Sequence, residues 1–197
     1  MIYVSFVSKN TVYEKVAEQY LIPSLKKWNL RYDIDYIENR GSWAENVYYK
    51  PEFINKMLRK HKEPIVSLDA DATIEKFPEL FERLPNNIDL AAHYLDWYSW
   101  YGKGNKQELL GGTLYFNYNE KILNMVNDWM IAQKKIKQYA QKVLAKMLEE
   151  HKNINIYKLP LEYCYIKNLP DGREPLIKLD PTILHHQVSR ELKHKKL

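Results

Sequence analysis

The sequence is poor in cysteine and contains no long apolar run. Cys164 is the only cysteine among the 197 residues, so an intrachain disulfide and a multi-cysteine zinc site are both excluded. Its neighbours Leu161, Tyr163 and Tyr165 predict a buried, small apolar residue. No run of about 18 apolar residues, the length of a membrane-spanning helix, is present, and the first residues lack the basic segment of a signal peptide. We therefore expect a soluble, cytoplasmic protein without a membrane span.

The excess of positive charge is modest and partly concentrated at one end. The formal net charge is +5, to which Lys193, Lys195 and Lys196 contribute at the C-terminus. A basic tail accounts for this excess, while anionic substrates or nucleic acid are also compatible with it. The 16 tyrosines and 5 tryptophans suit stacking on sugars or bases as well as ordinary cores. Composition leaves these uses open.

The first part of the chain alternates between strand and helix patterns. Strands are predicted over Tyr3–Val7 and Tyr32–Ile37 and again up to Asp69, and helices over Thr11–Trp28 and Pro51–Arg59. Thr11 or Asn10 is the expected cap of the first helix, which Pro23 breaks or kinks. This alternation predicts a parallel sheet, whose ligands bind beyond the carboxyl ends of its strands.

The second part continues the α/β pattern around an aromatic segment. Asp89–His93 and Leu109–Phe116 are predicted strands, and 121–134 and 139–150 are predicted helices. Between the strands, we expect 94–101 to form a loop in which Tyr94, Trp97 and Trp100 serve as a lid or contact an acceptor. No repeat or linker interrupts the chain. We therefore expect one α/β domain over residues 1–197, with a mostly parallel twisted sheet flanked by helices.

Two carboxylates stand at the end of the apolar run Ile65–Leu68. Asp69 and Asp71 are one residue apart, so an extended chain projects them to the same side where the strand surfaces. An Asp-rich strand end can be a simple turn. It can also hold a divalent cation, because carboxylate oxygens are the ligands of Mg²⁺ and Mn²⁺.

A strand-like segment near the C-terminus, 183–190, offers complementary groups. His185 and His186 supply imidazole, Ser189 a hydroxyl and Arg190 a fork of donors suited to phosphate. Along a straight strand His185 and Arg190 would face opposite sides. If both served one diphosphate, the strand would have to end near Gln187 and the chain would have to turn.

An ordered series of motifs resembles the DxD-containing GT-A glycosyltransferases, in particular small bacterial or phage-type members. The series comprises Ser42-Trp43 with Asn46 and Lys50–Ile54, Ile65–Asp71, Gly111–Phe116, Gln141 with Leu144, Leu159–Tyr163, and His185–Arg190. It spans most of the chain. The resemblance implies a GT-A fold and a metal-dependent transfer of sugar from a nucleotide-sugar donor, with UDP as the expected nucleotide, inside a bacterium or a phage-infected cell.

The resemblance also implies roles for particular residues. Asp69, Asp71 and His185 would hold Mn²⁺ or Mg²⁺, with His186 in a packing position. The residues implied to bind the nucleotide or donor are Val7, Ser8, Trp43, Asn46, Lys50, Asp69, Ala70, Gly112, Thr113, Ser189 and Arg190. The acceptor, whether a glycan, a protein or a modified DNA base, is not specified, and the short chain leaves room for an oligomer.

No catalytic residue is assigned from the sequence. In related sequences an acidic residue often precedes the helix that carries Gln141, but here Tyr139 and Ala140 occupy those positions.

Two other functions remain open at this point. Asp69-Ala70-Asp71-Ala72-Thr73 also resembles the first motif of haloacid-dehalogenase-type phosphatases, in which Asp69 would be the nucleophile and Asp71 the general acid–base. The position of this motif after a later strand, with no second acidic pair, argues against that function. The third alternative is a non-catalytic module that binds nucleotides or nucleic acid by aromatic stacking.

Overall fold

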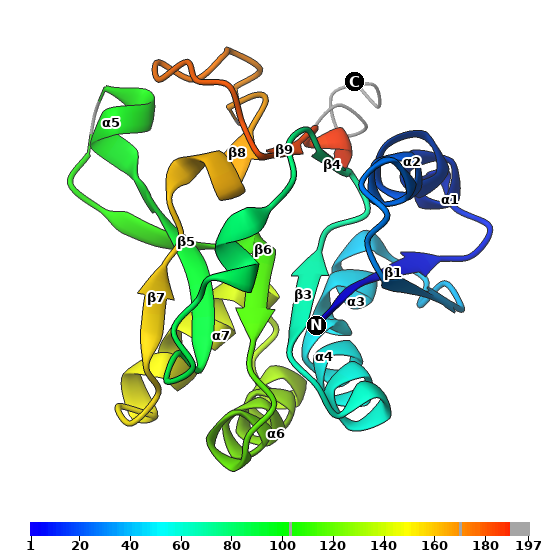
Figure 1. Cartoon of the computed structure of the whole chain (residues 1–197), viewed down its shortest axis with the longest axis vertical. Coiled ribbons are helices and arrows are strands. Elements are labelled where there is room, and N and C mark those ends of the chain that lie inside the picture. Colours follow the sequence, from blue (N-terminus) through cyan, green and yellow to red (C-terminus); the bar gives the residue numbers. More distant parts are fainter. Residues whose placement is uncertain (103, 170, 190–197) are drawn as a thin grey trace.

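The centre of the fold is a six-stranded sheet with the strand order β2-β1-β3-β6-β5-β7 (Figure 1). The structure, a computed structural model, describes residues 1–102, 104–169 and 171–189. The strands of this sheet are β1 (Ile2–Ser8), β2 (Tyr32–Ile37), β3 (Ile65–Leu68), β5 (Leu90–Asp96), β6 (Gln107–Phe116) and β7 (Ile156–Lys158). Within the described ranges, no helix is long and apolar enough to cross a membrane.

The sheet is mostly parallel, as the sequence predicts. β1 pairs in parallel with β2 and with β3, and β5 pairs in parallel with β7. β6 lies antiparallel to both of its neighbours, β3 and β5. Because β1, β2 and β3 run in the same direction, their carboxyl ends meet at one edge, where Asp69 follows β3.

The first helical segment is continuous but irregular. It consists of α1 (Val12–Val16), the π-helical turn η1 (Ala17–Leu21) and α2 (Ile22–Lys27). The Thr11 side chain accepts a hydrogen bond from the Tyr13 N–H and caps α1, as expected. Pro23 lies just after the π-helical turn, and this widened turn accommodates a residue that lacks an N–H. The predicted break is therefore a π-helical turn placed just before the proline.

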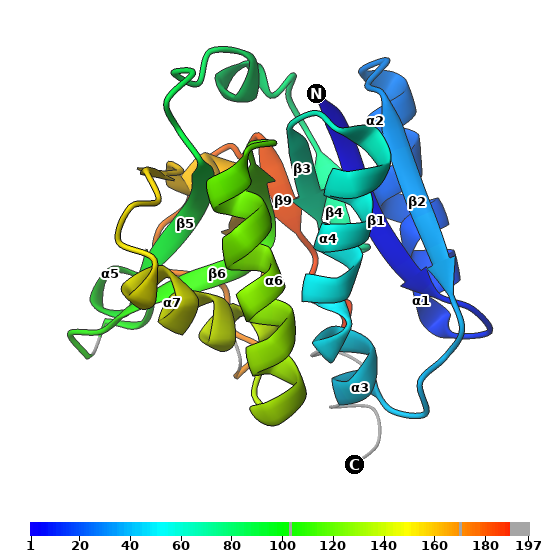
Figure 2. The ribbon, with the colours of Figure 1, turned by 90° about the horizontal axis from the view of Figure 1, so that it is seen from below.

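Helices cover the two faces of the sheet unequally. α4 (Lys50–His61), α6 (Glu120–Lys135) and α7 (Ala140–Glu150) lie on one face, and α1 and α2 lie on the other, behind β1 and β2 (Figure 2). The short α3 (Trp43–Tyr48) precedes α4. The single-turn 3₁₀ helices are η2 (Glu79–Glu82) and η3 (Leu161–Tyr163).

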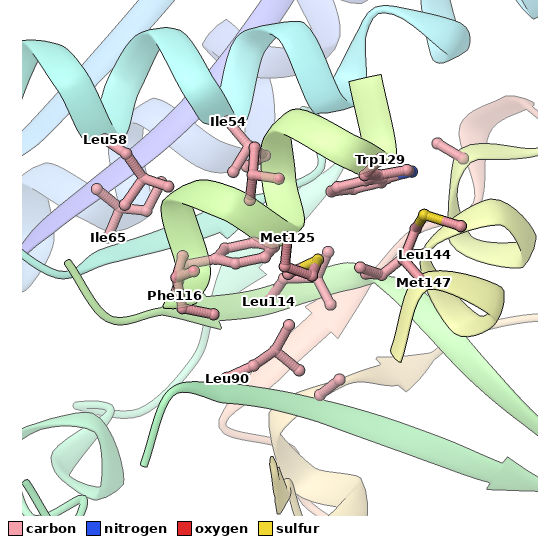
Figure 3. Packing of buried hydrophobic residues seen from close by; sticks show 14 of the residues in the cluster. Ile54, Leu58, Ile65, Leu90, Leu114, Phe116, Met125, Trp129, Leu144 and Met147 are labelled. Atoms are coloured by element: carbon pink, nitrogen blue, oxygen red, sulfur yellow. The ribbon is translucent and has the colours of Figure 1, made fainter. Parts of the chain in front are cut away.

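Alternating side chains of the strands divide the core into two parts. Ile65 and Phe116 pack with α4, α6 and α7, whereas Val66 and Tyr115 pack on the opposite face. Figure 3 shows the larger part, with Trp129 and Met125 of α6 between α4 and the sheet. Such alternation is what two-sided burial of a sheet requires.

The segment 94–101 is not the loop that the sequence predicts. β5 continues to Asp96, and α5 (Trp97–Tyr101) follows, capped by the Asp96 carboxylate and ended by Gly102 in the left-handed conformation. Trp100 is only 2% exposed and packs with Leu95 and Tyr165 in a separate small core. A helix of five residues is stable only through its tertiary packing, here the burial of Trp100. The hydrophobic periodicity of so short a segment does not predict it.

Substitution of Trp129 measures how much the packing of α6 against the sheet contributes to stability. Its side chain is 0% exposed, whereas Ile131 on the same helix is 48% exposed. Trp129→Ala should lower the free energy of unfolding by about 3–5 kcal/mol because it leaves a cavity. Ile131→Ala, the matched control, should change it by less than about 1 kcal/mol. Urea unfolding measures both values, and equal effects would contradict this packing.

Candidate metal and nucleotide site

A second, three-stranded sheet brings distant parts of the chain together at the end of β3. Its order is β4-β9-β8, with β4 (Ala72–Ile74), β8 (Tyr165–Ile166) and β9 (Ile183–His185). In Figure 1 these strands lie near the upper end of β3. Ala72 pairs with His185, so the antiparallel β4–β9 pair sets His185 directly beside Asp71.

Asp69, Asp71 and His185 form one cluster of potential metal ligands. One ligand atom of each residue lies within 4.8 Å of the others. Nδ1 of His185 is 3.9 Å from Oδ1 of Asp71. Asp71 and His185 are buried, while the Asp69 side chain is 48% exposed. Two carboxylate oxygens and one imidazole nitrogen suit a divalent cation such as Mn²⁺.

His185 is held by one ring nitrogen and leaves the other without a partner. Nε2 lies 2.9 Å from Oγ1 of Thr113, which fixes the orientation of the ring. Nδ1 is buried and has no hydrogen-bond partner among the described residues. A buried nitrogen without a partner is costly, and a bound cation would supply the missing interaction. The donor set thus fits a metal ion.

Opposing effects act on the protonation of the two buried groups. Burial favours the neutral carboxyl, but contact with His185 and a 3.0 Å hydrogen bond from the Val188 N–H leave the pKa of Asp71 below its ordinary value. Burial lowers the pKa of His185, but the Cys164 sulfur and the Asp71 carboxylate outweigh it and raise the pKa. The Asp71 carboxylate is thus available as a ligand, and a cation would compete with the proton for the His185 ring.

Lys50 neutralises the exposed carboxylate. Its Nζ lies 2.7 Å from Oδ1 of Asp69 and also donates to the carbonyl of Gly111. The lysine side chain is only 8% exposed. An ammonium group in this position compensates for part of the negative charge of the cluster. Because Lys50 also lines the cavity, it could contact an anionic ligand there.

The chain turns immediately after His185, as one diphosphate site would require. β9 ends at His185, and Gln187 has a left-handed φ of 58°. The strand predicted to continue to residue 190 is therefore too long. His186 points away from the cluster: it stacks on Tyr20 with ring centroids 3.9 Å apart and contacts Oγ1 of Thr73. It occupies the packing position.

A cavity of about 480 Å³ opens onto the cluster. Its volume lies within the usual range of small-molecule sites. The residues singled out from the sequence that line it are Ser8, Trp43, Asn46, Lys50, Asp69, Ala70, Asp71, Trp97, Gly112, His185 and Ser189.

The other residues singled out from the sequence lie elsewhere. Val7 and Trp100 are buried and do not line the cavity. Thr113 is buried behind the wall and reaches the cluster through His185. Tyr94 is partly buried against the larger core, and Arg190 lies outside the described residues.

Several residues of the cavity wall could not be predicted from the sequence. Tyr13 faces Asp71 from α1, and burial together with that carboxylate raises the pKa of Tyr13 to about 12. Glu108 enters from β6, and Cys164 is buried as expected but also lines the cavity. None of them belongs to a motif.

Solved structures share this architecture at low sequence identity. Neither a protein-family model nor a curated protein sequence matches the chain. A glycosyltransferase involved in glycosylation of the major capsid of PBCV-1 superposes with a TM-score of 0.67 at 12% identity, covering 100% of this chain and 99% of that one. The bifunctional glycosyltransferase WbbM gives 0.65 at 15%, covering 95% and 45%. Mouse xyloside xylosyltransferase 1 gives 0.58 at 8%, covering 96% and 99%.

The chain has the GT-A glycosyltransferase fold. In this glycosyltransferase fold, the cluster of Asp69, Asp71 and His185 stands at the edge where the first three strands end.

The two neighbouring histidines should differ in their effect on cation binding. His185→Ala removes a ring nitrogen from the cluster and should weaken Mn²⁺ binding about 10-fold or more. His186→Phe keeps the stack on Tyr20 and should leave the affinity unchanged. Titration of free Mn²⁺ by electron paramagnetic resonance measures both. Loss in the His186 variant alone would move the ligand to that residue.

Gly112 is predicted to keep the space that His185 occupies. A Cβ on Gly112 would lie 2.7 Å from Cε1 of His185, so the ring would have to move. Gly112→Ala should therefore reduce Mn²⁺ affinity about 10-fold or more, as displaced ligand-supporting groups do. On Gly111 the added atom would lie 3.2 Å from Cβ of Gln141, away from the ring. Gly111→Ala is the control, and equal losses would contradict the explanation.

Proposed function

We propose that this chain is a metal-dependent glycosyltransferase that uses a nucleotide-sugar donor, with UDP as the nucleotide. The observation that carries this proposal is the Asp69, Asp71 and His185 cluster, which lines a cavity of about 480 Å³ in a glycosyltransferase fold. On this proposal residues 1–197 act as one catalytic domain.

The cluster provides the place for the diphosphate of the donor. A divalent cation held there supplies positive charge that stabilises the departing diphosphate. Asp71 and His185 would hold it from the buried side, and Asp69 from the open side. Lys50, whose ammonium already contacts Asp69, would add a second positive charge to the donor-binding wall.

The nucleotide would lie along the wall formed by β1 and α3. Ser8, Trp43 and Asn46 line the cavity there, and Tyr13 lines it from α1. Trp43 packs edge-on against Tyr139, with ring centroids 5.6 Å apart, and both side chains line the cavity. Such rings suit a planar base, while the hydroxyl and amide groups offer it hydrogen bonds.

The fold and the placement of the carboxylates favour transfer over the two alternatives. A phosphatase of the haloacid-dehalogenase type would place its nucleophile after the first strand, whereas Asp69 follows β3. A module that binds by stacking alone does not need two carboxylates facing a buried imidazole. Metal dependence separates the proposed enzyme from such a module.

Release of nucleoside diphosphate from a panel of nucleotide sugars tests the proposal. The protein should release UDP slowly from at least one UDP-sugar with Mn²⁺, and this release should stop in a chelator. Asp71→Asn keeps an oxygen for the Val188 N–H but removes the charge, so the rate should fall about 100-fold. Asp180→Asn, whose side chain is 83% exposed, is the control.

Two outcomes would contradict the proposed function. If no nucleotide sugar is cleaved and no nucleotide binds, the chain is not a transferase of this kind. If release continues unchanged in the chelator, or in Asp71→Asn, the reaction does not depend on the cluster.

A further inference from the structure

Glu108 occupies the cavity wall on the same strand as Gly112. Along β6, Glu108, Leu110 and Gly112 lie two residues apart and all line the cavity. Gly112 abuts His185 of the metal cluster. Four residues of extended strand span at most roughly 13 Å, and the pairing of β6 with β5 is irregular between Leu109 and Leu114. Glu108 thus lines the same cavity as the metal cluster without belonging to it.

Two neutral donors fix the Glu108 carboxylate. Nε1 of Trp97 donates to Oε2 at 3.1 Å, and Nε2 of Gln141 donates to Oε1 at 3.0 Å. Gln141 is itself held, because its Oε1 accepts a hydrogen bond from the Gly111 N–H. The carboxylate is therefore positioned from two sides, by α5 and by α7.

Glu108 has spare hydrogen-bond acceptor capacity and no ion-pair partner among the described residues. Among the described residues, no cationic side chain lies within ion-pair distance of it, unlike Asp69 with its lysine partner. Each oxygen of a carboxylate can accept more than one hydrogen bond. The group is thus able to accept a further hydrogen bond from a molecule in the cavity.

An aromatic surface lies next to this carboxylate. Trp97 and Tyr101 stack with ring centroids 4.6 Å apart and an interplanar angle of 25°, and both line the cavity. Leu95 and Leu110 extend the apolar wall. A flat apolar surface beside a fixed carboxylate matches a sugar ring, which offers C–H groups on one face and hydroxyl donors at its edge.

We propose that Glu108 is the residue that binds the acceptor, accepting a hydrogen bond from a hydroxyl group of a carbohydrate. This assignment rests on the proposed glycosyltransferase function. The acceptor sugar would lie on Trp97, with one hydroxyl directed by Glu108 toward the donor sugar. An anionic acceptor group at this position would be repelled by the uncompensated carboxylate.

The test uses methyl glycosides of common hexoses and pentoses as acceptor probes, added to the protein with Mn²⁺ and the UDP-sugar that it cleaves. At least one glycoside should accelerate UDP release by the wild type. Glu108→Gln should raise the KM for that glycoside about 10- to 100-fold, because a hydrogen bond to a charged group is lost. Mn²⁺-dependent UDP binding, measured by calorimetry without glycoside, should stay within about twofold.

Two further variants separate acceptor binding from a general structural effect. Trp97→Phe keeps the aromatic surface but removes the donor that orients Glu108, so it should raise the same KM by a smaller factor. Glu149→Gln, at an exposed position of α7, should change neither parameter.

Three results would contradict different parts of the proposal. An active wild type whose KM for the glycoside is unchanged in Glu108→Gln overturns the assignment of Glu108 alone. Acceleration by a single-stranded oligonucleotide or a peptide, but by no glycoside, overturns the carbohydrate acceptor. A wild type that cleaves no nucleotide sugar overturns the proposed function, and the assignment of Glu108 with it.

Discussion

The pairing of β4 with β9 is the interaction on which the candidate site depends. Asp69 and Asp71 follow a strand of the large sheet, but His185 comes from the far end of the chain. The backbone joins them: the His186 N–H donates to the carbonyl of Asp71 at 3.1 Å, and the Val188 N–H donates to its carboxylate. The same carboxylate thus anchors the chain after β9 and faces the imidazole.

The sequence was sufficient to predict the elements in which one local pattern dominates. Alternating and continuous apolar residues predicted β1, β2 and β3. The carboxylates after β3 were recognisable because two aspartates, one residue apart, directly follow an apolar run. The turn at Gln187 could be predicted from parity, since His185 and Arg190 cannot share a side of a straight strand. The antiparallel direction of β6 carries no local signal.

Features that depend on tertiary contacts could not be predicted. Trp97 and Trp100 are three residues apart, yet one lines the cavity and the other is buried with Tyr165. Their difference arises from which neighbour each ring meets, and a short aromatic segment does not specify that. Glu108 is similar: the orientation of its carboxylate comes from Trp97 and Gln141, which lie on other elements.

The hydrogen bond from the Val188 N–H to the Asp71 carboxylate joins residues that are 117 positions apart in the sequence. A ligand bound by Asp71 would therefore also affect the stability of the fold. Bringing such distant segments together has an entropic cost that local interactions do not offset. A cation held by Asp71 and His185 would act as a non-covalent crosslink between them, and its binding free energy would add to the stability of the small sheet. The ion would then be a structural component of the protein as well as a participant in its chemistry.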